Sequence, residues 1–188
     1  MDFKVIAVPT AKLVAIGAVT TALLFMTNNA TAAKIEENNA AAAVKNRQMV
    51  LEAADGFDEK TVTVDGTEYT YYEATNGTGY VFSGSNKGYG GQVVTMVGID
   101  AEGKIVGTLV TEAADETPGL GAKWLATDAA NKDRLAQFAG DVPDSNFAVT
   151  KDGGTIQAVS GATFTSRAVT ADVNAAIAQY KAVTGGAN

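Results

Sequence analysis

The sequence predicts an α+β fold: one domain with an antiparallel sheet and flanking helices, preceded by a single N-terminal transmembrane helix. Three observations lead to this prediction. An uncharged apolar run covers residues 13–26. From residue 61 onward, short segments alternate apolar and polar residues and are separated by turn sequences, the pattern of strands. Near the C-terminus the period becomes helical, with four residues on one face: Val169, Val173, Ile177 and Tyr180.

The apolar N-terminal segment is long enough to cross a membrane. A helix over residues 8–30 reaches the length of about 20 residues that a bilayer requires. Lys4 and Lys12 precede the apolar run, so the positive-inside tendency places the N-terminus in the cytoplasm and the rest of the chain on the extracellular or periplasmic side of the cell (inner) membrane. A cleaved signal peptide is the alternative, because Ala30-Thr31-Ala32 has the small-residue pattern of a cleavage site. We favour the anchor.

An alanine-rich polar segment follows and is expected to form a helical stalk over residues 34–56. Alanine has the highest helix propensity, and Gly56 is a natural helix end. The chain is therefore divided into a cytoplasmic N-terminus and anchor at residues 1–33, a stalk at 34–58 and a globular domain at 59–188.

The globular domain is expected to begin with strands and to end with a helix. Asp65-Gly66 predicts a hairpin turn. Thr165 or Ser166 is a suitable N-cap for the final helix, and Gly185 and Gly186 would end it. The expected strands are 61–64, 68–73, 79–82, 92–99, 104–111, 147–149 and 155–159, with an irregular helix over 122–138.

Composition excludes several kinds of chemistry. The chain has no cysteine and no histidine, which rules out iron–sulfur ligation, disulfides, Ser-His and Cys-His catalytic pairs and most zinc sites. We expect no metal site. The net charge is −7 and no basic patch is present, so nucleic acid is not an expected partner. Any redox function must use an organic cofactor.

The segment Ser160-Gly-Ala-Thr-Phe-Thr-Ser166 lies between an expected strand and the N-terminus of the final helix. Free backbone N–H groups and the helix dipole make such a turn favourable for a phosphate. Gly161 tolerates positive φ and leaves the backbone accessible. An ordinary helix cap rich in serine and threonine has the same composition, so the segment alone leaves both interpretations open.

Ser160-Gly161-Ala162-Thr163 resembles the S/T-G-A-T signature of flavin mononucleotide (FMN)-binding domains in the G subunit of Rnf complexes and in the C subunit of the sodium-pumping NADH:quinone oxidoreductase. Glu116-Thr-Pro-Gly-Leu-Gly121 is similar to a segment that lies against the flavin in the Rnf family. Gly88-Tyr-Gly-Gly91 resembles the family's glycine-rich approach to its central hairpin. The resemblance spans nearly the whole chain.

The resemblance implies FMN bonded covalently through its phosphate to Thr163, attached by a dedicated flavin transferase. It implies an electron-transfer subunit that performs no catalysis of its own, within a membrane complex that moves electrons between ferredoxin and NAD and translocates ions. The other membrane subunits would be its partners. The implied cofactor-binding residues are Thr163, Ser160, Gly161, Ala162, Thr165, Glu116, Thr117, Pro118, Gly119, Leu120 and Tyr89.

Three other functions remain as alternatives: the C subunit of the sodium-pumping quinone reductase, a stand-alone exported flavinylated electron carrier, and a non-redox exported binding module. Gln157 departs from the family, which usually has an acidic residue three positions before the serine. Trp124 is expected to be a packing residue and not a flavin stacker. Arg167 either pairs with the phosphate or is solvated.

Overall fold

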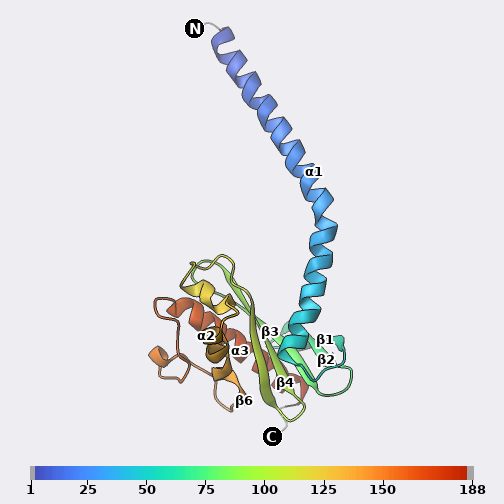
Figure 1. The fold of residues 1–188 in the computed structure, drawn as a ribbon, viewed down its shortest axis with the longest axis vertical. Coiled ribbons are helices and arrows are strands. Elements are labelled where there is room, and N and C mark those ends of the chain that lie inside the picture. The colour runs from blue at the N-terminus through green and yellow to red at the C-terminus, as the bar shows by residue number, and fades with distance from the viewer. Residues whose placement is uncertain (1–2, 186–188) are drawn as a thin grey trace. The chain divides into compact units, whose positions relative to one another are not determined.

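The computed structural model describes residues 3–185 and divides the chain into two units, Met1–Val44 and Lys45–Asn188. Helix α1 spans Phe3–Val50, so the expected membrane helix and stalk form one continuous helix (Figure 1). By length and composition, Ala7–Val50 is the one span among the described residues that could cross a membrane. The helix ends six residues before Gly56, because Gln48 Nε2 donates to the carbonyls of Glu52 and Ala54 and fixes the turn that follows.

The second unit is built on a six-stranded sheet in which every strand is antiparallel to its neighbour and the spatial order equals the chain order. The predicted α+β class is confirmed. The strands are β1 (Phe57–Val64), β2 (Thr67–Ala74), β3 (Gly79–Lys87), β4 (Gln92–Asp100), β5 (Lys104–Glu112) and β6 (Gly140–Asp141).

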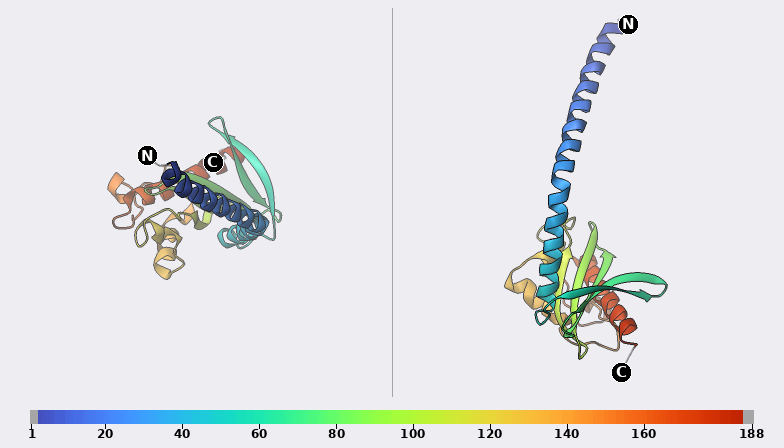
Figure 2. Two further views of the ribbon diagram at one scale, coloured as in Figure 1. Left: turned by 90° about the horizontal axis from the view of Figure 1, so that it is seen from above. Right: turned by 90° about the vertical axis from the view of Figure 1, so that its right-hand side faces the viewer.

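The hairpin of β1 and β2 lies partly outside the rest of the sheet. β1 pairs with β2 along its whole length, whereas β2 pairs with β3 at two positions only, Tyr72 with Val81 and Glu73 with Tyr80. The distal half of the hairpin therefore turns away from β3 (Figure 2). The turn is the expected Asp65-Gly66, and both residues have positive φ.

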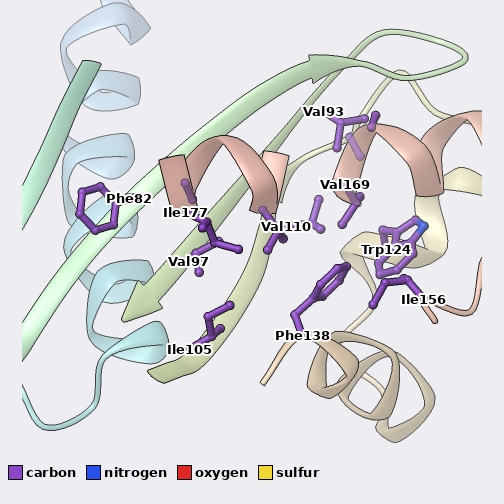
Figure 3. Packing of buried hydrophobic residues seen from close by; sticks show 14 of the residues in the cluster. Phe82, Val93, Val97, Ile105, Val110, Trp124, Phe138, Ile156, Val169 and Ile177 are labelled. Carbon is purple, nitrogen blue, oxygen red and sulfur yellow. The ribbon is translucent and has the colours of Figure 1, made fainter. Parts of the chain in front are cut away.

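Helix α3 (Thr163–Val183) packs against β3 and β4 on one face of the sheet. Its apolar stripe meets the alternating apolar residues of the strands, with Val97 and Val110 opposite Val169 and Ile177 (Figure 3). Trp124 and Phe138 close the same core from the segment that follows β5. A second, smaller apolar cluster is formed by Val50 and Leu51 together with Met96 and other apolar residues of the strands.

The helix and the two short strands that the sequence predicts after β5 are wrong in detail. Residues 122–138 are not one helix but a 3₁₀ turn η1 (Gly121–Leu125), helix α2 (Ala129–Leu135) and a second 3₁₀ turn η2 (Ala136–Phe138), because Asp128 caps a new helix by accepting from Asn131 N. The short strands 147–149 and 155–159 are a single parallel bridge between Val149 and Ile156, with the 3₁₀ turn η3 (Thr150–Asp152) between them.

The start of α3 also differs from the expectation. The helix begins at Thr163 after Ala162, so neither Thr165 nor Ser166 is its N-cap; both hydroxyls bond inside the fold instead. At the other end the helix stops at Val183, and Gly185, which was expected to end it, follows with a positive φ. Gly186 lies outside the described residues.

Candidate cofactor site

A cavity of about 510 Å³ lies where the loop after β3, the turn after β5 and the start of α3 meet. This volume is within the range of small-molecule and cofactor sites. Its wall combines exposed aromatic and apolar side chains with one buried carboxylate. The lining residues are Tyr89, Glu116, Thr117, Leu120, Gly121, Gly161, Ala162, Phe164 and Thr165.

Glu116 joins the three segments that form the cavity. Its side chain is only 3% exposed, and each carboxylate oxygen accepts a hydrogen bond from a different segment. Gly90 N donates to Oε1 at 3.0 Å, and Thr165 Oγ1 donates to Oε2 at 2.6 Å. A buried carboxylate is tolerated when its oxygens are satisfied in this way.

Glycines make room for this carboxylate. A Cβ on Gly88 would collide with Glu116 Oε1, and a Cβ on Gly121 would collide with Glu116 Oε2. Glycine at these two positions therefore allows the backbones of both segments to approach the Glu116 side chain closely. The Pro118-Gly119 turn has type II character, since Leu120 N bonds to Thr117 O and Gly119 has a φ of 77°.

Ser166 anchors the turn that carries the S-G-A-T motif. Its Oγ accepts from Val159 N at 3.1 Å and from Trp124 Nε1 at 3.3 Å, and donates to Ala162 O at 2.8 Å. Ala162 N in turn donates to Val159 O, which closes a β-turn with Gly161 at a φ of 78°. One buried hydroxyl therefore fixes the motif against the core.

Thr163 is the first residue of α3 and is half-buried. The first backbone hydrogen bond of the helix runs from Ser166 N to Ala162 O, which leaves the N–H groups of residues 163–165 without an acceptor inside the helix. No side chain caps this end, and its first turn contains no acidic residue. An uncapped helix N-terminus fits a phosphate, so this part of the site agrees with the FMN that the motif implies.

The cavity brings together seven of the residues expected at the site: Tyr89, Glu116, Thr117, Leu120, Gly161, Ala162 and Thr165. Thr163 is not part of its wall, although Ala162 and Phe164 on either side of it are. Pro118 and Gly119 shape the turn without lining the cavity. Ser160 lies with Gln157, Lys123 and Arg134 around a second cavity of about 340 Å³.

Two neighbouring side chains are occupied elsewhere. Arg167 forms a two-pronged ion pair with Asp152, with Nε to Oδ2 at 2.7 Å and Nη2 to Oδ1 at 2.6 Å. Its hydrogen bond lowers the pKa of the Asp152 carboxyl. Arg167 is therefore paired with Asp152 at an exposed position. Trp124 is fully buried, which confirms the prediction that it is a packing residue (Figure 3).

Sequence reasoning missed Phe164 and the buried position of Glu116. Phe164 is 64% exposed on the first turn of α3. The signal was present, because a large apolar residue there lies off the stripe formed by Val169, Val173 and Ile177. Glu116 stands near Glu112 and Asp115 in the sequence, and carboxylates on loops are usually solvated; only the fold shows that Glu116 points inward.

The whole chain and the segments that form this cavity are similar to known proteins. Residues 88–178, which include every residue lining the cavity, match the FMN-binding domain family. The chain is 37% identical to the G subunit of the Na(+)-translocating ferredoxin:NAD(+) oxidoreductase complex of Acetobacterium woodii, over 96% of this chain and 94% of that protein. It is 34% identical to the G subunit of the proton-translocating ferredoxin:NAD(+) oxidoreductase complex of Clostridium ljungdahlii, over 74% and 72% of the two chains.

A third relative extends the similarity to both ends. The G subunit of the ion-translocating oxidoreductase complex of Methanosarcina acetivorans is 30% identical over 98% of this chain and 99% of its own length. Similarity of this extent includes the long N-terminal helix as well as the sheet and the cavity. The chain therefore belongs to the G subunits of ion-translocating oxidoreductase complexes and carries their FMN-binding domain.

Proposed function

We propose that this chain relays electrons through an FMN bonded to Thr163 as a phosphoester, within an Rnf-type complex that moves electrons between ferredoxin and NAD and translocates ions. The relatives from Acetobacterium woodii and Clostridium ljungdahlii are named as subunits of such complexes. The observation that carries the proposal is that Thr163 begins an uncapped helix directly beside a cavity of cofactor size.

The two parts of the site suit the two parts of FMN. A phosphoester at Thr163 keeps one negative charge, and the N–H groups of residues 163–165 favour an anion at that position. Leu120 and Phe164 supply apolar surface, and Tyr89 supplies an aromatic ring, for a planar ring system in the cavity. When bound, the flavin supplies reversible electron uptake, while this chain binds it, orients it and limits its contact with water.

A covalent link suits a carrier that is exported and tethered. We propose that α1 is retained as a single-pass anchor in the cell (inner) membrane and that Lys4 and Lys12 keep its N-terminus in the cytoplasm. A tether raises the effective concentration of the flavin domain near its redox partners in the membrane complex. The division into anchor (1–33), stalk (34–58) and flavin domain (59–188) stays a prediction.

Attachment of the flavin is tested on the full chain produced with a flavin transferase. Trypsin releases residues 152–167 as one peptide, which mass spectrometry should find carrying FMN at Thr163. Thr163→Ala should abolish the acid-stable flavin, whereas Thr155→Ala, an exposed threonine in the same peptide, should keep it. An unmodified wild-type peptide would refute the proposal, and flavin on Thr163→Ala would place the attachment elsewhere.

Topology and assembly need separate tests. The natural chain has no cysteine, so Ser145→Cys, at an exposed position, creates a unique label site. A membrane-impermeant maleimide should label it in spheroplasts without lysis, and intact-protein mass spectrometry should find residues 1–33 still attached. Mild-detergent purification should recover the other subunits of an Rnf-type complex; recovery of sodium-pumping quinone reductase subunits would support that alternative instead.

A further inference from the structure

The buried carboxylate of Glu116 has a consequence beyond holding segments together. It is a component of the cavity wall, and both its oxygens face hydrogen-bond donors, Gly90 N and Thr165 Oγ1. Neither donor carries a charge. No ion pair to Glu116 occurs within residues 3–185, so its charge is not neutralised by a cationic side chain there.

We propose that Glu116 lowers the reduction potential of the flavin held in this cavity, in addition to positioning the cavity walls. This inference rests on the proposed function, since it requires a flavin in the cavity. Each electron that enters that site adds negative charge next to a fixed carboxylate. The two charges repel, and burial of the Glu116 carboxylate keeps water from screening this repulsion fully.

Glu116→Gln removes the negative charge of the side chain while keeping its shape. Glutamine has the same length, its carbonyl oxygen still accepts from Gly90 N, and its amide donates to the Thr165 hydroxyl oxygen. The packing of the three segments is therefore kept while one negative charge is lost. Asp115→Asn is the matched control, because it removes a neighbouring carboxylate that is exposed and screened by water.

The measurement is an equilibrium spectroelectrochemical titration of the flavinylated full chain in mild detergent at fixed pH. Glu116→Gln should shift the reduction potential in the positive direction, and Asp115→Asn should move it clearly less. A Glu116→Gln potential equal to that of the wild type, or an equal shift in Asp115→Asn, would overturn the inference.

A second variant keeps the inference testable if Glu116→Gln fails to take up flavin. Thr165→Val removes one hydrogen-bond donor from the carboxylate and leaves its charge in place. The carboxylate charge is then stabilised by one hydrogen bond fewer, so the reduction potential of the flavin should become more negative than that of the wild type. A Thr165→Val potential at or above the wild-type value would show that repacking and not charge controls it, which contradicts the inference.

Failure of this inference is distinct from failure of the proposed function. A wild-type chain without covalent flavin refutes the function by mass spectrometry, before any potential is measured. A flavinylated wild type whose potential does not respond to Glu116 refutes only the inference.

Discussion

The burial of Asp172 should make the stability of the fold depend on pH, and one substitution should remove this dependence. The residue lies in α3 facing the sheet and is fully buried. Its two partners are neutral: Asn86 Nδ2 donates to Oδ1 at 2.8 Å and Thr95 Oγ1 donates to Oδ2 at 2.9 Å. Burial raises the pKa of the carboxyl from 3.8 to about 7, and these two hydrogen bonds offset only part of that effect.

The direction of the effect follows from proton binding. Between pH 3.8 and about 7 the native state holds a proton on Asp172 that the unfolded chain has released. The free energy of unfolding therefore falls as pH rises through this window, and the full loss is present above pH 7. About three pH units correspond to about 4 kcal/mol, and relaxation around the charged group makes about 2–4 kcal/mol the expected range.

Asp172→Asn should lose this dependence. Its amide oxygen still accepts from Asn86, and its amide group donates to the Thr95 oxygen, so the packing is kept without a titrating group. We expect the variant to match the wild type below about pH 3.8, where Asp172 is protonated in both states, and to be more stable by about 2–4 kcal/mol at about pH 8. Asp144→Asn, at an exposed position, should leave the pH profile of the wild type unchanged.

The assay is urea unfolding of the full chain in mild detergent at several pH values, without bound flavin. The single tryptophan, Trp124, is fully buried within the second unit, so its fluorescence reports the unfolding of that unit. The difference between wild type and variant isolates Asp172 from the other titrating groups. Parallel pH profiles for the two proteins would refute the reasoning.

Two further outcomes follow from contacts around the motif. Ser166→Ala removes a hydroxyl that joins Val159 N, Trp124 Nε1 and Ala162 O, so we expect a loss of about 1–3 kcal/mol in urea unfolding and a lower covalent flavin content, while Ser145→Ala at an exposed position changes neither. Arg167→Gln should leave the flavin content of the chain unchanged, because Arg167 is paired with Asp152; loss of flavin in that variant would show that the guanidinium binds the phosphate.

Local sequence was sufficient for the elements whose signals repeat at short range. The alternation of strands β1 to β5, the Asp65-Gly66 turn and the apolar stripe of α3 depend on neighbours a few residues away, and the structure confirms them. Family membership was also accessible, because the Ser160–Thr163 motif and the Glu116–Gly121 segment are continuous in the chain.

Tertiary structure alone decided which polar groups are buried and what they contact. Glu116 and Asp115 are adjacent carboxylates, yet the hydrogen bonds from Gly90 N and Thr165 Oγ1 go to the Glu116 carboxylate, because the fold brings three distant segments to one point. The buried contacts of Asp172 and of the Ser166 hydroxyl could not be predicted for the same reason. Burial of a polar side chain depends on partners far away in sequence, which periodicity and short motifs do not encode.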